Sequence, residues 1–363
     1  MVEPQPSKLM TRVRFPSPAP QDWLTALILF GIKAVFVRVP GDEPVAPSNL
    51  QVRGTFTSGL FCFDHPARDM CFGMLVPQRK KEVIDMADSK AEYSTPDCLA
   101  PAAIEAKTEA AGVTKANLPT SKAFMLAMFA GAFIAFGGLF FTVFLSDPTL
   151  GWGAQRFVGG LAFCLGLVLV LICGAELFTG NSLMVCALKS KKITLAQMLK
   201  AWVAVWIGNF AGALFVVFLV YMAAIYKLNG EAVANTMVSV AAGKVSIDAV
   251  TIFFRGILCN IFVCLAVWIG TAGRTVIDKV VGILLPIAAF VACGFEHCVA
   301  NMYFLPMGIL MHSCGYGVDV AGADALNAAG LALNLSVATL GNIVGGALIV
   351  ALGYWFIYAN REA

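Results

Sequence analysis

Charged residues are scarce in this sequence. Asp, Glu, Lys and Arg make up 13% of the 363 residues, whereas 59% of the residues are hydrophobic. Soluble domains contain about 25% charged residues, so the composition excludes an ordinary soluble protein and indicates a lipid environment. The formal net charge is only +3, and no Lys/Arg run is longer than Arg79–Lys81. Binding to nucleic acid is therefore not expected.

The eleven cysteines do not indicate a disulfide framework. Most of them lie inside apolar stretches, where cysteine behaves as a small hydrophobic residue: Cys164, Cys173, Cys259, Cys264, Cys293 and Cys298. The cysteine content therefore does not identify the redox compartment.

Long apolar stretches without Asp, Glu, Lys or Arg alternate with short charged segments. They cover residues 123–146, 157–175, 201–226, 256–273, 280–295, 298–318 and 325–360. A membrane-spanning helix needs about 20 apolar residues, which several stretches provide. We interpret the two stretches that end at Glu176 and Glu296 as parts of single broken helices. The sequence thus predicts an all-α membrane protein with six transmembrane helices, of which helices two and five are broken.

Lysine and arginine residues predict the orientation. They cluster before the first expected helix, between helices two and three, between four and five, and after helix six: Lys115, Lys122, Lys189, Lys191, Lys192, Lys200, Arg274, Lys279 and Arg361. Such cation-rich segments are typical of the cytoplasmic side. We therefore expect both termini in the cytoplasm, although Arg156, Lys227, Lys244 and Arg255 on the opposite side reduce the contrast.

The two halves of the apolar region repeat each other. A Cys-Gly-x-Glu motif followed by Asn occurs at Cys173–Asn181 and, with the same spacing, at Cys293–Asn301. A Gly-Asn-x-x-Gly motif occurs at Gly208–Gly212 and Gly341–Gly345. Chance similarity between glycine-rich helices would not reproduce two motifs in the same order. Since each half has three helices, the second half must enter the membrane from the opposite side, which is the inverted repeat of transporters and channels.

Residues 1–85 have neither helical nor strand periodicity and are expected to be an unstructured or mis-annotated extension. Part of it resembles an in-frame translation of the end of a transfer-RNA gene, which would make Met86 the natural start. The alternatives are a disordered tail and a targeting segment; Leu24–Val37 is too short to span a membrane. We expect residues 86–121 to form a cytoplasmic segment and residues 122–363 to form the six-helix transmembrane domain.

Three ionisable side chains lie at the expected helix breaks: Glu176, Glu296 and His297. The glutamates occupy equivalent positions in the repeat, where backbone N–H groups lack partners that a carboxylate could supply. We favour this structural capping role over a proton relay. His297 corresponds to Leu177 in the first half, and this asymmetry indicates a function. Histidine titrates near neutral pH and donates hydrogen bonds to anions; the alternative is a histidine that is merely hydrogen-bonded inside the bundle.

A metal site formed by Cys293, Glu296, His297 and Cys298 is an alternative, which would make the protein a membrane-embedded metalloenzyme. Cys293 has a counterpart in Cys173, however, and no second histidine lies in a matching position. We therefore expect no metal, no cofactor and no enzymatic activity.

The sequence resembles the formate/nitrite transporter family from about Lys122 to Ala363. Three segments carry the resemblance: Gly174–Asn181, Gly294–Met302, in which the family more often has Ser at the position of Cys298, and Gly256–Ala266. The resemblance implies an aquaporin-like protomer with its own pore, assembled as a homopentamer in the inner (plasma) membrane of a bacterium. The same fold accommodates water channels, but the chain contains no Asn-Pro-Ala triplet, which disfavours that function.

The resemblance also implies roles for individual residues. His297 matches the central pore histidine, Thr179 matches its hydrogen-bonding partner, and Lys244 matches the lysine that attracts anions. Apolar residues that narrow the pore match Phe163, Leu167, Leu177, Phe178, Val263 and Phe290. Polar positions near the path match Asn260, Asn301 and Asn342.

The expected substrate is a small monovalent weak-acid anion, carried as the neutral acid or together with a proton that passes through His297. Formate comes first, because Phe295 is more like formate-type members than the Tyr common in nitrite-type members. Nitrite comes second, followed by hydrosulfide, acetate and lactate. The residues leave open which anion is physiological, the direction of flow, and whether the protein is a channel or a proton-coupled carrier.

Overall fold

The computed structural model describes residues 56–57, 60–63, 70–73 and 97–359. The chain divides into two units, one ending at Ile84 and the other beginning at Asp85. In the first unit, three short strands form an antiparallel sheet in the order β1 (Phe56–Thr57), β2 (Leu60–Phe63) and β3 (Met70–Gly73). Most of residues 1–85, and Met86, lie outside the described residues, so their assignment as an extension stays a prediction.

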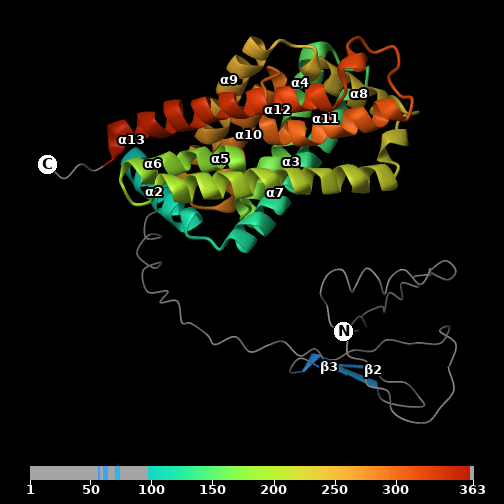
Figure 1. Ribbon diagram of the computed structural model, residues 1–363. Coiled ribbons are helices and arrows are strands. Elements are labelled where there is room, and N and C mark those ends of the chain that lie inside the picture. Colours follow the sequence, from blue (N-terminus) through green and yellow to red (C-terminus); the bar gives the residue numbers. More distant parts are fainter. Residues whose placement is uncertain (1–55, 58–59, 64–69, 74–96, 360–363) are drawn as a thin grey trace, which may run out of the picture. The chain divides into compact units, whose positions relative to one another are not determined.

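The second unit is helical (Figure 1). Its α-helices are α2 (Pro101–Ala116), α3 (Thr120–Leu145), α4 (Trp152–Cys173), α5 (Phe178–Asn181), α6 (Val185–Lys189), α7 (Leu195–Met222), α8 (Ala232–Val245), α9 (Ala249–Ala272), α10 (Val276–Ala292), α11 (Cys298–Ser313), α12 (Ala328–Ile343) and α13 (Leu352–Tyr358). Short 3-10 helices are η3 (Ser182–Met184), η4 (Ile225–Lys227) and η5 (Ala323–Ala325), and the π-helix η6 (Val344–Ala351) joins α12 to α13.

Within the described residues, five helices are long and apolar enough to cross a membrane: α3, α4, α7, α9 and the continuous helix Ala328–Tyr358. Each lies where the sequence predicted a spanning segment. The helices α10 and α11 have 17 and 16 residues, or about 25 Å each, which is less than the ~30 Å hydrocarbon core. They follow one another across the break that the sequence predicted near Glu296.

The chain leaves the helical conformation at both repeats of the Cys-Gly-x-Glu motif. The helix α4 ends before Gly174, which has φ +76, and α10 ends shortly before Gly294, which has φ +72. Glycine adopts this left-handed conformation without the steric cost that other residues incur. The chain then runs extended through Leu177 or His297 before α5 or α11 begins. The sequence repeat is therefore also a repeat of backbone geometry.

Two helices, α2 and α8, were not expected, because neither contains a long apolar stretch. They lie at opposite ends of the helical unit: α2 contacts α6 and α13, whereas α8 contacts α11 and η5 (Figure 1). Each immediately precedes the first long helix of its half, α3 or α9. The two helices thus occupy equivalent places in the repeat.

The Gly-Asn-x-x-Gly motifs bring pairs of long helices into backbone contact. A Cβ atom on Gly212 would lie 1.9 Å from the carbonyl oxygen of Met128, so only glycine lets α7 approach α3 this closely. In the second half, a Cβ atom on Gly345 would lie 2.2 Å from the carbonyl oxygen of Ile257 in α9. Small residues at such contacts are typical of helix packing in membranes.

The helix α2 carries two buried carboxylates one turn apart, Glu105 and Glu109. Ser190 and Lys192 bind the Glu109 carboxylate, whereas Oε1 of Glu105 has no hydrogen-bond partner. Burial is the main cause that raises the pKa of Glu105; the negative charge of Glu109 adds to it, and Lys192 opposes it.

We expect the packing of α2 to be strongest in mild acid. Because the folded state raises the pKa of Glu105, the stabilisation is complete below the ordinary pKa of 4.5 and is lost as the pH rises through the raised value. Glu105→Gln should remove this pH dependence, measured as amide-exchange protection of residues 101–116 relative to intrinsic exchange rates. Asp319→Asn, at an exposed site, is the control. Wild-type pH dependence in Glu105→Gln would show that another group titrates.

Candidate pore and anion site

Asparagine side chains hold the two helix breaks. In the first half, Oδ1 of Asn209 accepts a hydrogen bond from the backbone N–H of Phe178 at 2.9 Å. Its Nδ2 donates to the carbonyl oxygens of Ala127 at 2.8 Å and Glu176 at 2.9 Å. One side chain therefore binds three backbone groups, two in the break and one in α3.

Asn342 does the same in the second half. Its Oδ1 accepts from the N–H of Cys298 at 2.9 Å, and its Nδ2 donates to the carbonyl oxygens of Gly256 and Glu296, both at 2.8 Å. Asn209 and Asn342 are both fully buried. Where water is absent, every backbone polar group needs a protein partner. The contacts of Asn342 thus fix the break, and its expected place near the pore path stays a prediction.

The glutamates bind side chains, and the expectation that they cap backbone N–H groups is wrong. Glu176 accepts from Lys115 at 2.7 Å and from Asn181 at 2.8 Å. A carboxylate only accepts hydrogen bonds, whereas an amide accepts and donates. Asparagine therefore suits a break that leaves one N–H and one C=O group without helical partners, and its second amide hydrogen ties the break to a carbonyl oxygen of the neighbouring long helix. The glutamate remains available for a cation.

The second half repeats this ion pair. Glu296 accepts from Lys244 at 3.0 Å and from Asn301 at 2.6 Å. The amide of Asn334 adds a contact to Glu296 at 3.2 Å and donates to the Lys244 carbonyl oxygen. Each half thus contains a buried network of Lys, Glu and Asn beside its helix break.

Lys115 was predicted only as a cation that flanks the first helix, not as part of a buried network. It is the counterpart of Lys244: the interval from Lys115 to Leu126 equals that from Lys244 to Arg255. The carbonyl oxygens of Leu126 and Arg255 accept from the N–H groups of Glu176 and Glu296, respectively. This matching interval was the signal in the sequence, but α2 and α8 lie outside the apolar stretches in which the repeat was sought.

Two cavities lie beside the breaks. The first, which we call the α8 cavity, has a volume of about 420 Å³ and is lined by α8 residues including Lys244, and by Phe163, Phe290, Glu296 and His297, among others. The second, the α2 cavity, has a volume of about 250 Å³ and is lined by α2 residues including Lys115, and by Leu167, Leu177, Gly180 and Asn181, among others. Each cavity therefore contains the lysine of one buried network.

His297 and Thr179 lie between the cavities. His297 lines the α8 cavity, and Thr179 lies between Phe178 and Gly180, the latter of which lines the α2 cavity. Nε2 of His297 is 3.0 Å from Oγ1 of Thr179, and both side chains are buried. Nδ1 accepts from the backbone N–H of Ala300 at 3.0 Å. Because that N–H can only donate, we assign the proton of the neutral ring to Nε2, which points to Thr179.

The aromatic residues expected to narrow the pore meet at the α8 cavity. Phe163 and Phe290 pack edge to face with ring centroids 5.7 Å apart. Phe290 also stacks on the His297 ring at 5.9 Å. These rings surround the imidazole with apolar surface on the side of the α8 cavity.

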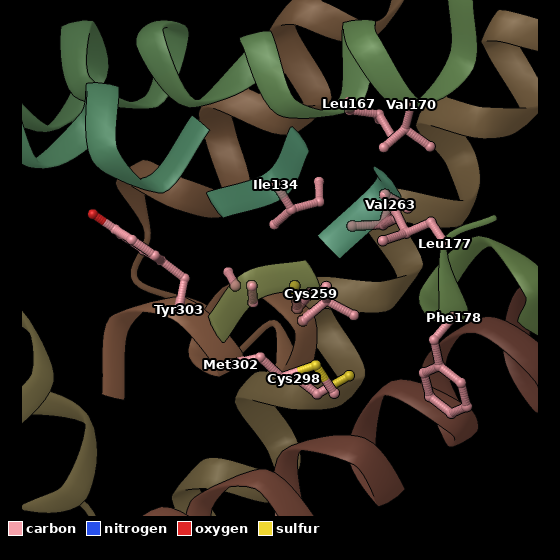
Figure 2. Packing of buried hydrophobic residues seen from close by; sticks show 14 of the residues in the cluster. Ile134, Leu167, Val170, Leu177, Phe178, Cys259, Val263, Cys298, Met302 and Tyr303 are labelled. Carbon is pink, nitrogen blue, oxygen red and sulfur yellow. The ribbon is translucent and has the colours of Figure 1, made fainter. Parts of the chain in front are cut away.

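The aliphatic residues lie toward the α2 cavity. Leu167 and Leu177 line it, and Figure 2 shows both, together with Val263, in one cluster of buried side chains. The ring of Phe178 packs against Trp202 at 6.0 Å. Within the described residues, Phe178 and Val263 are buried without lining either cavity.

Asn260 and Asn301 have structural partners. Nδ2 of Asn260 donates to the carbonyl oxygens of Thr179 at 3.2 Å and Asn342 at 2.6 Å, which ties the Thr179 turn to α12. Asn301 binds Glu296. Neither side chain lines the α8 or the α2 cavity, so their direct effect is to hold Thr179 and Glu296 in position.

The Cys293–Cys298 segment is not arranged as a metal centre. Among the described residues, no group of three or more His, Cys, Asp or Glu side chains is placed to hold a metal ion. Cys293 is exposed, whereas Cys298 is buried.

Asn342→Leu should destabilise the protein by about 2–4 kcal/mol, because the buried N–H of Cys298 and the buried C=O of Glu296 lose their partner and the break loses its tie to α9. The thermal unfolding temperature of the detergent-solubilised protein measures this loss. Leu340→Ala in the same helix, at a side chain that is 58% exposed, is the matched control and should have little effect. Equal effects of the two variants would contradict the capping role.

Comparisons with known proteins agree with this architecture. The model of the family described as "Formate/nitrite transporter" matches residues 102–356. "Formate channel FocA" of Escherichia coli (strain K12) is 40% identical over 282 residues, which cover 73% of this chain and 96% of that protein. "Probable formate transporter" of Methanothermobacter thermautotrophicus is 37% identical over 264 residues, covering 68% and 92%.

Solved structures are also similar. A structure described as "Pentameric formate channel with formate bound" has a TM-score of 0.61 and 36% identity, and the match covers 66% of this chain and 98% of that chain. An "FNT family ion channel" has a TM-score of 0.62 and 30% identity, covering 70% and 98%.

Proposed function

The chain belongs to the formate/nitrite transporter family, and we propose that it carries formate through a pore in each protomer of a homopentamer in a bacterial plasma membrane. It is a multi-pass membrane protein and a transporter rather than an enzyme, as its family membership implies. This excludes the metalloenzyme alternative. Relatives named as formate channels support formate as the substrate, and the pentameric relative supports the assembly.

The observation that carries the proposal is the His297–Thr179 pair between two cavities that each contain a lysine. An anion needs positive charge outside a barrier and a hydrogen-bond donor within it. Lys115 and Lys244 supply the charge, and Nε2–H of His297 supplies the donor. The apolar rings of Phe163 and Phe290 keep bulk water from the imidazole.

We further propose six spans in two inverted halves. The segment α10–α11 is the broken fifth span, and the matching networks at opposite ends of the helical unit support inversion. Cation-rich segments flank the α2 end, with Lys107, Lys115 and Lys279 in the lining of the α2 cavity. The α2 cavity then opens to the cytoplasm, because positive charge marks that side, and the α8 cavity opens to the outside.

The barrier determines the form in which formate crosses. Moving a bare carboxylate into an apolar region costs tens of kcal/mol in the idealised limit, so the ion must be neutralised. Desolvation favours uptake of a proton by the carboxylate itself. The lysines concentrate the anion before it reaches this region, and the protonated acid then passes the rings.

The hydrogen bonds of His297 favour a proton that comes from solution. Donating a proton to formate would require an imidazolium ring, with hydrogen on both nitrogens. Protonation of Nδ1 would break its bond from the N–H of Ala300 and leave two donors facing each other. His297 therefore stays neutral and donates a hydrogen bond from Nε2–H to an oxygen of the passing acid.

His297→Ala should reduce formate uptake into proteoliposomes by about two- to tenfold, the effect of losing a hydrogen bond between neutral groups. His297→Asn, which retains an N–H donor, should lose less. Uptake by the wild type and by both variants should rise similarly as the pH falls, because protonation of formate limits each. His312→Asn, at the far end of α11, is the control. A pH dependence that disappears with His297 would show that the imidazole supplies the proton.

Lys244→Gln should raise the formate concentration at half-maximal uptake, with a smaller effect on uptake at saturation, because the lysine concentrates the anion near the barrier. Lys244→Arg should restore most of the wild-type behaviour, since it keeps the charge beside Glu296. Uptake should be measured over a range of formate and salt concentrations. A defect confined to the maximal rate would contradict the role of Lys244 in attraction.

A further inference from the structure

The α8 cavity contains two arginines that the repeat does not explain. Arg156 of α4 and Arg255 of α9 both line it. When Arg156 is shifted by the interval that separates the two Cys-Gly-x-Glu motifs, the matching residue is Val276. The residue that matches Arg255 is Leu126, because the carbonyl oxygens of both accept from the backbone N–H of the motif glutamate. The lysines, in contrast, occur in both halves. The extra positive charge therefore belongs to one end of the protein only.

Arg156 binds the C-terminal end of α10. Its Nε and Nη2 donate to the carbonyl oxygens of Ala292 and Val291, both at 3.1 Å. These carbonyls form the C-terminal, partially negative end of a helix, which would repel an approaching anion. Arg156 covers that end and holds the segment leading to Glu296 and His297.

Arg255 does not bind the end of a helix in this way. Within the part of the chain that the structure describes, no hydrogen bond or ion pair engages its half-buried guanidinium group. The charge of Arg255 lies close enough to repel the charge of Arg156. Arg156 itself lies against the helix break, because its Nη2 is 3.2 Å from the place where a Cβ atom on Gly294 would be. Glu296, the carboxylate of this cavity, is already paired with Lys244. Two neighbouring positive charges with one unpaired are unfavourable in a half-buried site unless an anion joins them.

We infer that Arg255 forms an anion-binding subsite in the α8 cavity, where its guanidinium group holds the carboxylate of the transported anion before it reaches His297. A guanidinium fork matches a planar carboxylate with two parallel hydrogen bonds. The cavity volume of about 420 Å³ leaves ample room for so small an ion beside Arg255. The α2 cavity has lysines but no equivalent arginine, so the two mouths of the pore differ in affinity. This inference rests on the proposed transport function.

The test compares formate uptake from the two sides, in right-side-out and inverted membrane vesicles of a bacterial host without its own formate transporters. Arg255→Gln should raise the half-saturating formate concentration about tenfold for uptake from the α8 side, as expected for a lost charge-assisted contact. Half-saturation from the α2 side should not change. The maximal rate should not fall, because removing a binding site outside the barrier does not obstruct passage. Arg255→Lys, which keeps the charge without the fork, should give an intermediate value.

Lys227→Gln is the matched control, since it removes one positive charge from an exposed residue near α8 that does not line the cavity. The inference is overturned if Arg255→Gln leaves half-saturation unchanged, if Lys227→Gln shifts it equally, or if only the maximal rate falls. Absence of formate uptake by the wild type would overturn the proposed function, and the subsite with it. A wild type that transports formate, combined with an unaffected Arg255→Gln variant, would reject the subsite alone.

Discussion

The helix breaks depend on one constraint: a backbone polar group that meets no water must find a partner in the protein. Asn209 and Asn342 meet it by each binding one N–H and two C=O groups. With these groups satisfied, the chain can leave the helix deep in the bundle. This brings Thr179 and His297, which come from different halves, to within hydrogen-bonding distance. Any pore chemistry at this pair therefore depends on the two asparagines.

Buried charge follows a similar rule. A lone carboxylate would be very costly inside the bundle, so Glu176 and Glu296 are each paired with a lysine and an asparagine. The ion pairs hold the lysine side chains in place beside the cavities. They also reduce the net positive charge that an anion encounters there. The α8 cavity regains positive charge from its arginines: Arg156 at the end of α10, and Arg255, whose guanidinium group has no partner among the described residues.

The repeat distinguishes the contacts that both halves share from those that only one half makes. Residues that recur in both halves, such as the asparagine caps and the Lys–Glu pairs, have equivalent contacts. Residues without a counterpart, of which His297 is the clearest, lie where the two halves meet or where a cavity opens. Comparison of the halves is thus informative even for a single chain, because symmetry explains what both halves need for packing and leaves the differences for chemistry.

The apolar helices, both breaks and the repeat follow from the amino-acid sequence alone, because hydropathy, glycine and motif spacing are local properties of the chain; the same patterns led to the prediction of a role for His297. The capping of the breaks was wrongly assigned to the glutamates, and Lys115 and Arg255 were used only to predict orientation. Lys115 binds Glu176, from which it is separated by 61 positions in the sequence. Arg156 and Arg255 line the same cavity only because α4, α9 and α10 pack together. Such contacts form only in the tertiary structure, because a local sequence pattern does not predict which distant group will bind a buried hydrogen-bond donor or a buried charge.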